Sequence, residues 1–249
     1  MKRILIILIS LLWASSGVAG SYLFKDNLYT NCEIITDKDP TILQNLLFVE
    51  EKRTKGFDRR RDENVVFKAF IFRAVMKENE DIIVRVNAEF KTKDEARIQP
   101  LKYSTMVGQL PNFLRSNLKT VTIHKGNKSW GGGHNNILIH TQNKYLEDKC
   151  NEEVMLHEVG HVSLDWQWGG LVDSKLWKKA AKADGMHISK YAKRFSKRED
   201  VAETINWWIG VRCYPERIDP LNYEKILEAI PHRLGYLDEQ NFDTYPLSC

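Results

Sequence analysis

This chain lacks an apolar run long enough to cross a bilayer as a helix. Its longest apolar stretch, 4–13, holds about ten residues, whereas a membrane-spanning helix needs about 20. A short positive start precedes this stretch and the small-residue sequence ASSGVAGS follows it, a pattern typical of an export signal. We therefore expect residues 1–20 to be a cleaved signal peptide and the mature chain to be secreted or periplasmic. The alternative is an uncleaved N-terminal anchor; after cleavage, no stable membrane insertion is expected.

The chain also lacks a strong excess of charge of either sign. The formal net charge is +4, and it falls to +2 once Lys2 and Arg3 leave with the signal peptide. This balance gives no indication of nucleic-acid binding or of attraction to an anionic membrane surface. One segment, 52–64, is locally basic, and we interpret it as a solvated loop.

Cysteine is scarce, and its spacing excludes one kind of metal site. The four cysteines are too scattered for a zinc ribbon, which needs pairs separated by a few residues. In an exported chain an even number instead predicts two disulfides. Three connectivities among Cys32, Cys150, Cys213 and Cys249 are possible, and the spacing does not choose between them.

No internal repeat or low-complexity tract is visible, so the elements must be identified from periodicity and turn signals. A β-rich hairpin is expected within 64–90, because two runs of β-branched and aromatic residues flank a polar turn. Strands are expected at 119–125 and 135–141, joined by a glycine-rich turn that contains WGGGH. Helices are expected at 92–110 with a kink or break at Pro100, in the segment opened by Pro111, from 148 to Gly169-Gly170, at 173–185, at 196–212 and at 221–230, with an irregular end.

This order predicts an α+β fold with a small mixed β-sheet, an active-site helix and a downstream glutamate-bearing helix. After the signal peptide we expect an N-terminal α+β layer of unknown role at 21–118 and a catalytic region at 119–249. One continuous domain, 21–249, is the alternative.

The motif His157-Glu158-Val-Gly-His161 is the strongest chemical signal in the chain. On a helix, histidines four residues apart share one face, so both rings can reach one ion. Glu158 is rotated about 100° around the helix, which lets its carboxylate reach water beside the ion and act as the general base. The expected helix buries a separate apolar stripe, formed by Met155, Val159, Val162 and Trp166.

A catalytic zinc site normally has three protein ligands and one open position. Leu164 and Gln167 stand where a metzincin needs Gly and His, so that class is excluded. His187 is a possible third ligand that follows Gly185 in a loop. Asp165, four residues after His161, fits better as a supporting residue that accepts a ring N–H than as a ligand.

The strongest candidates for the third ligand lie on the expected helix 196–212. Glu199 and Glu203 are four residues apart and so share one face. One carboxylate can bind the metal while the other accepts a ring N–H from a ligating histidine. The spacing alone does not show which of the two carboxylates is the metal ligand and which accepts the ring N–H.

These segments resemble a known group of enzymes. The stretches LHEVGHVSLDW, SKLWKKAAKADG and SKYAKRFSKREDVAETINWW are similar to the catalytic part of gluzincin-type zinc metallopeptidases, in particular the lethal factor-like group. The resemblance covers about 120–212 and includes a tyrosine followed by a Glu-x-x-Ala-Glu segment. It implies a zincin-like fold, Zn²⁺ bound by His157, His161 and Glu199, and Glu203 as the supporting residue. It also implies that Tyr191 donates to the oxyanion of the tetrahedral intermediate.

We therefore expect an exported zinc metallopeptidase that cleaves a peptide or protein substrate through water activated by zinc and Glu158. The strand expected at 135–141 would form the edge along which an extended substrate pairs. His134 would lie at the rim of the cleft, although WGGGH is more simply a turn. Alternatives are a catalytically silent zinc-binding or scaffold protein of the cell envelope, and a zinc hydrolase of a non-peptide bond. Cleavage preference and oligomeric state cannot be read from the sequence.

Overall fold

A computed structural model of the protein describes residues 21–25, 32–77, 80–142, 150–164 and 170–249. The expected signal peptide at 1–20 therefore lies outside the described residues, as does Asp165. The strands are β1 (Ser21–Phe24), β2 (Leu43–Asp58), β3 (Glu63–Met76), β4 (Ile82–Asn87), β5 (Thr120–His124), β6 (Gly131–Gly133), β7 (Asn136–His140) and β8 (Met186–Ser189).

Helices follow the strands in both halves of the chain. The α-helices are α1 (Lys93–Gln109), α2 (Asn112–Arg115), α3 (Asn151–Ser163), α4 (Lys175–Asp184), α5 (Lys190–Arg194), α6 (Asp200–Cys213), α7 (Pro220–Ala229) and α8 (Pro231–Asp238). Short 3-10 helices are η1 (Ala88–Phe90), η3 (Leu171–Asp173) and η4 (Pro215–Arg217). The expected α+β class with a mixed sheet is confirmed.

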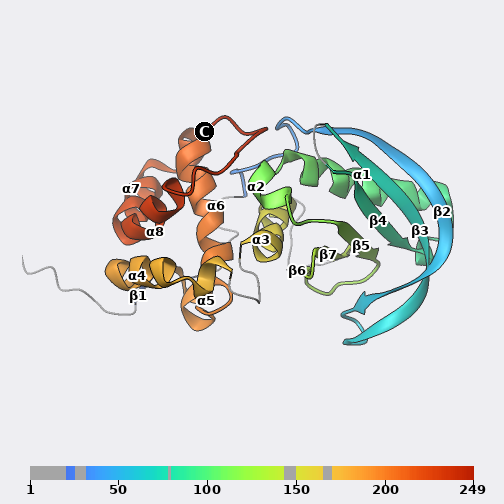
Figure 1. Ribbon diagram of the computed structural model, residues 1–249, viewed down its shortest axis with the longest axis horizontal. Helices are drawn as coiled ribbons and strands as arrows, with labels where there is room; N and C mark the ends of the chain where they lie inside the picture. The colour runs from blue at the N-terminus through green and yellow to red at the C-terminus, as the bar shows by residue number, and fades with distance from the viewer. Residues whose placement is uncertain (1–20, 26–31, 78–79, 143–149, 165–169) are drawn as a thin grey trace, which may run out of the picture.

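The main sheet has six strands in the order β2-β3-β4-β5-β7-β6. β4, β5 and β7 are parallel, whereas β2, β3 and β6 each run antiparallel to a neighbour. In Figure 1 the sheet occupies the right of the molecule with α1 along one face, α3 lies at the centre, and α4 to α8 lie on the left. The boundary expected between residues 118 and 119 falls between β4 and β5, which pair within this one sheet.

The hairpin expected within 64–90 is confirmed as β3 and β4. The interpretation of 52–64 as a loop is wrong for most of that segment. Residues 52–58 continue the 16-residue strand β2 and residues 63–64 open β3, so only 59–62 turn. The long, mostly exposed β2 carries a run of charged residues from Glu50 to Lys55 that hides its β periodicity. Its pairing with β3 makes this polar segment a strand.

The glycine-rich connection between β5 and β7 also differs from expectation. Gly131–Gly133 is the strand β6, and it pairs antiparallel with β7. β7 consequently lies between β5 and β6, so the expectation that 135–141 forms the sheet edge is wrong. His134 and Asn135 have φ of 49° and 59°, which fits the two-residue turn of a tight hairpin.

Helix boundaries agree with the periodicity for α4, which begins after Ser174 and is ended by Gly185 in the left-handed conformation. α1 runs unbroken through Pro100, so the expectation of a break there is wrong. α6 begins at Asp200, four residues after the expected 196, so Glu199 is its N-cap. α3 ends at Ser163, earlier than the expected Gly169-Gly170. The end expected to be irregular contains α8, whose leucines at 234 and 237 are buried.

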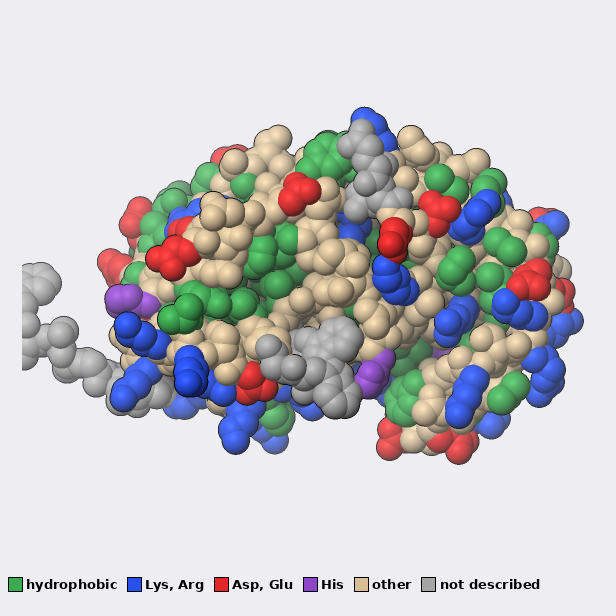
Figure 2. Space-filling view, in the orientation of Figure 1, with side chains coloured by type: hydrophobic (Ala, Val, Ile, Leu, Met, Phe, Trp, Pro, Cys, Tyr) green, Lys and Arg blue, Asp and Glu red, His purple; other side chains and the backbone are tan. Residues whose placement is uncertain are grey.

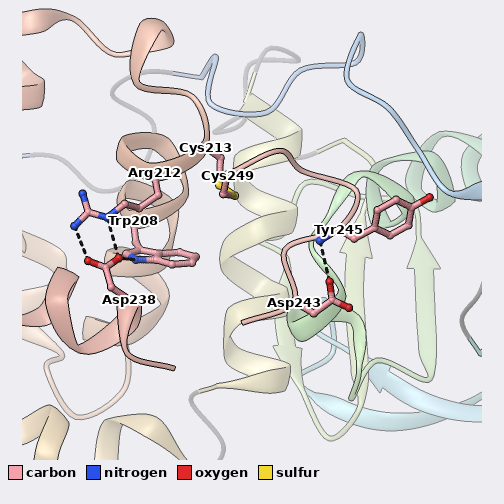
Figure 3. Close-up of a disulfide and its surroundings, with 7 residues drawn as sticks. All are labelled: Trp208, Arg212, Cys213, Asp238, Asp243, Tyr245 and Cys249. Atoms are coloured by element: carbon pink, nitrogen blue, oxygen red, sulfur yellow. Dashed lines mark hydrogen bonds and ion pairs between the residues drawn. A yellow bond between two sulfur atoms is a disulfide. The ribbon is translucent and has the colours of Figure 1, made fainter. Parts of the chain in front are cut away.

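Two disulfides resolve the connectivity that the sequence left open. Cys32 bonds to Cys150, immediately before α3, and Cys213 at the end of α6 bonds to the C-terminal residue Cys249. Figure 3 shows the second bond beside the end of the helix that carries Trp208, whose indole donates to Asp238. Two disulfides fit an oxidising compartment.

Across the described ranges, we find no helix with the length and apolar character needed to span a membrane.

Candidate metal centre

The helix α3 presents the HExxH motif from a buried position. Its apolar stripe is confirmed at Met155, Val159 and Val162, each at most 1% exposed, while Trp166 lies outside the described residues. His157 is 6% exposed, and the next histidine of the motif, His161, is half-buried. The ring of His157 therefore faces the protein interior.

The helix α6 packs against α3 in antiparallel register and brings the glutamates to the histidines. Gly160 allows a close approach, because a Cβ at this position would lie 3.3 Å from the Ile205 side chain and 3.5 Å from the Ala202 Cα. One turn further along, the Asn206 side chain donates to the carbonyl oxygen of Glu153 at 3.2 Å.

Three side chains converge at the end of this helix pair. The Nε2 atoms of His157 and His161 lie 3.0 Å apart, and Glu199 Oε2 lies 3.3 Å and 3.0 Å from them, respectively. An ion bound tetrahedrally at about 2.0–2.1 Å from each ligand keeps the ligand atoms about 3.3 Å apart. The spacing and the donor set of two imidazoles and one carboxylate therefore fit a metal ion, and within the described residues this is the group that could hold one.

The two oxygens of Glu199 have different partners. Oε2 faces the histidine pair, whereas Oε1 accepts a hydrogen bond from the Tyr191 hydroxyl at 3.1 Å and from Arg198 Nε at 2.8 Å. Burial raises the pKa of Glu199, but hydrogen bonds from the two histidines outweigh burial and leave the pKa well below its usual range. Glu199 is therefore an anion that can bind an ion through Oε2 while Oε1 stays anchored.

Tyr191 is thus beside the predicted metal ligand. Burial, together with the neighbouring Glu199 charge, raises the pKa of Tyr191 to about 12. The hydroxyl keeps its proton at neutral pH and can donate a hydrogen bond.

Glu203 lies on the other side of His157. Its carboxylate is fully buried, and Oε2 accepts a hydrogen bond from Ser189 Oγ at 2.6 Å while Oε1 lies 3.7 Å from His157 Nδ1. Ser189 also caps α5, because its Oγ accepts from the Ala192 N–H. This position, next to the ring nitrogen that faces away from the ligand cluster, suits a residue that orients a metal-bound imidazole.

The remaining predicted residues are placed as follows. Glu158 is half-buried on α3, next to the first histidine of the motif. His187 is on β8 and, although half-buried, it does not belong to the ligand group. His134 is exposed in the turn after β6.

The strand β6 lies against α3 at Glu158. A Cβ added to Gly132 would be 1.8 Å from the Glu158 carbonyl oxygen, so only glycine fits this contact. Sequence reasoning did not identify this role, although three consecutive glycines before a strand are a signal of close backbone approach.

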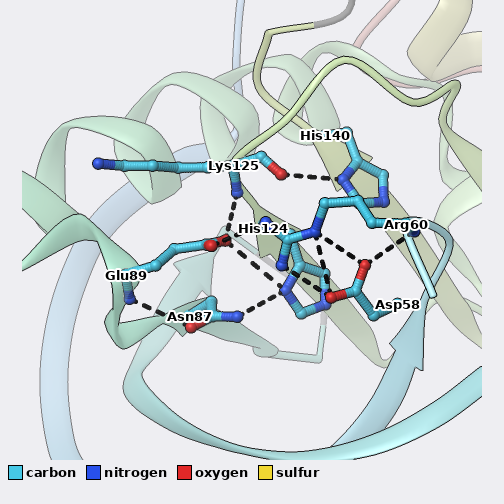
Figure 4. Close-up of polar contacts among 7 residues, drawn as sticks. All are labelled: Asp58, Arg60, Asn87, Glu89, His124, Lys125 and His140. Carbon is cyan, nitrogen blue, oxygen red and sulfur yellow. Dashed lines mark hydrogen bonds and ion pairs between the residues drawn. The ribbon is translucent and has the colours of Figure 1, made fainter.

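A second polar cluster was also missed because its members are far apart in the sequence. Four strands that run in the same direction end in polar residues: β2 in Asp58, β4 in Asn87, β5 in His124 and β7 in His140. These side chains lie close together at the carboxyl ends of the strands (Figure 4). Arg60 donates to both Asp58 oxygens and holds the pKa of that carboxyl down at about 2. Arg60, in the β2–β3 turn, also donates to Glu89 at 2.7 Å, so the cluster connects this turn to the carboxyl ends of the neighbouring strands.

Comparison with protein-family models, with curated proteins and with solved structures finds no match to this chain.

Proposed function

We propose that this protein is an exported, zinc-dependent metallopeptidase with a zincin-like fold. The observation that carries the proposal is the cluster of two HExxH imidazoles and one carboxylate, with ligand atoms 3.0–3.3 Å apart. His157, His161 and Glu199 would hold the ion. A bound zinc ion supplies Lewis-acid chemistry, since it polarises a carbonyl group and makes water more acidic.

The side chains around the ligands have separate roles in this proposal. The Glu158 carboxylate accepts a proton from the attacking water and returns it to the leaving nitrogen. Glu203 orients the His157 ring through Nδ1. The Tyr191 hydroxyl, which keeps its proton, donates to the oxyanion that develops on the substrate carbonyl, a contribution of roughly 2.7–4 kcal/mol for one such donor.

The strand β6 gives the substrate a place to align. It is the last strand in the sheet order and contacts the helix that carries Glu158. An extended peptide can pair with such an edge by main-chain hydrogen bonds. This favours a peptide or protein substrate over the alternatives of a silent zinc-binding scaffold and a hydrolase of a non-peptide bond.

The test combines metal content with cleavage. We expect one zinc per chain by elemental analysis and cleavage of members of a broad peptide library. Glu158→Gln should keep the zinc and abolish cleavage, because the amide cannot accept the proton. A wild-type protein that binds no zinc would refute the proposal, and zinc binding without any cleavage would favour the scaffold.

A further inference from the structure

A basic segment directly precedes the ligand Glu199. Residues 190–198 contain five cations and no acidic residue, and all five are exposed: Lys190, Lys193, Arg194, Lys197 and Arg198. The whole chain carries a net charge of +4, so the residues outside this segment sum to −1. Residues 52–61 on the β2–β3 hairpin carry the same local excess of +5, but only the segment 190–198 directly precedes the ligand Glu199. Figure 2 shows Lys and Arg side chains gathered along the lower edge of the molecule, where Figure 1 places α5.

The segment is held in a defined conformation. Two guanidinium groups contact the Phe195 ring, with Arg194 and Arg198 at 5.0 Å and 5.4 Å from its centroid. Lys193 lies over the Tyr22 ring of β1 at 5.8 Å. Cation–π contacts of this kind restrict the side chains while leaving their charges in solvent.

Arg198 connects this surface to the candidate metal centre. Its side chain is 67% exposed, and its Nε donates to Glu199 Oε1 at 2.8 Å. A molecule that binds the basic segment therefore lies next to the site where the substrate would react.

We propose that the basic segment 190–198 is a docking surface for acidic side chains of a peptide or protein substrate. The inference rests on the proposed peptidase function and specifies its substrate class. Charge complementarity favours carboxylates as the occupant. An anionic membrane is a poorer fit, because none of the large exposed apolar side chains lies in this segment and membrane-binding surfaces normally combine cations with such anchors.

The experiment measures binding without requiring cleavage. A fluorescein-labelled 12-residue peptide of alternating Glu and Gly is compared with its Gln/Gly counterpart by fluorescence anisotropy on the full-length mature protein. Exposed ion pairs each contribute only a few-fold in affinity, so several together should make the acidic peptide bind roughly tenfold more tightly at low salt. The preference should shrink as salt is raised, because salt screens exposed charges.

The variant K193E/R194E/K197E should abolish the preference. Arg198 is left intact because it contacts Glu199. The control R53E/K55E/R61E reverses three exposed cations on the β2–β3 hairpin and should keep the preference. Equal binding of both peptides to wild type, or equal loss in both variants, would overturn the docking surface. The docking surface would also be overturned if the wild type bound phosphatidylserine vesicles, the variant K193E/R194E/K197E did not, and neither peptide was preferred.

Failure of the proposed function gives a different pattern. If the acidic peptide binds with the expected dependence on the segment but no peptide is ever cleaved, the docking surface stands and the peptidase activity does not. If peptides are cleaved, their kcat/KM should favour Glu over Gln near the scissile bond by a similar factor, and the first variant should remove that difference.

Discussion

The contact between β6 and α3 can be tested by the substitution Gly132→Ala, which adds one methyl group to the strand. In Gly132→Ala, the new Cβ would lie 1.8 Å from the Glu158 carbonyl oxygen and 2.7 Å from the carbonyl carbon. Real Cβ atoms essentially never approach a neighbour closer than 3.0 Å, so the strand and the helix must separate by about 1.2 Å. Both sides of this contact are backbone, and no side-chain rotation relieves it.

The expected consequences follow from that displacement. Overpacking of this kind typically destabilises a protein by about 1–3 kcal/mol. A displacement of about 1 Å in a catalytic region can lower the rate by about 100-fold. We therefore expect Gly132→Ala to lower the melting temperature measurably and, in the proposed peptidase, to reduce kcat/KM far more than it reduces zinc content.

Gly131→Ala is the matched control. Its Cβ would meet the far end of the Arg59 side chain at 2.2 Å, and this flexible group can move away at little cost. The assays are thermal unfolding followed by circular dichroism, zinc content, and cleavage of the best library peptide. Equal stability and activity in Gly132→Ala and Gly131→Ala would refute the close contact between β6 and Glu158.

Three further predictions concern the ligand set, pH dependence and a disulfide. Glu199→Gln should lower zinc binding well below one ion per chain, whereas Glu203→Gln should keep one ion with affinity about 10–100-fold weaker in a chelator competition assay; the reverse pattern would exchange their roles. Burial raises the pKa of Glu153 from 4.5 to about 7, so its contribution to stability is complete below pH 4.5 and is lost as the pH rises through 7. Wild type should therefore lose about 3 kcal/mol relative to Glu153→Gln between pH 4.5 and 8 in urea unfolding, and parallel pH profiles would contradict this. Removing the Cys213–Cys249 bond, which closes a loop of 36 residues, should lower the free energy of unfolding by about 4 kcal/mol, and an unchanged urea midpoint would contradict the loop-closure argument.

The sequence predicted the local elements well where a single periodicity dominates. The stripe of α3, the cap and stop of α4, and the β3–β4 hairpin follow from spacing and turn residues. The placement of His157 and His161 on one face of α3 was also predictable from the i, i+4 rule, whereas the spacing left Glu199 and Glu203 undecided and only the family resemblance favoured Glu199. In each case the deciding interactions lie within one element or between neighbouring elements.

The rest depends on contacts between distant segments. β2 has a polar sequence because the side chains on both of its faces are mostly exposed, and only pairing with β3 makes it a strand. The edge position of β6 depends on the order of parallel strands, which the spacing of glycines does not encode. Likewise, Asp58 and His124 lie close together at the carboxyl ends of their strands only because of the tertiary fold (Figure 4).

Because α3 and α6 are antiparallel, the disulfides and the candidate metal ligands lie at opposite ends of the helix pair. Cys150 immediately precedes α3 and Cys213 ends α6, so both disulfides lie at the end remote from Glu199. At the other end, only non-covalent contacts and the proposed ion connect the helices. Removing the metal should therefore increase amide hydrogen exchange near 157–164 and 196–203, while 150–154 and 209–213 stay protected. Loss of the metal would then be a local opening that is reversed when zinc is restored, while the disulfide-linked end of the helix pair stays folded without the ion.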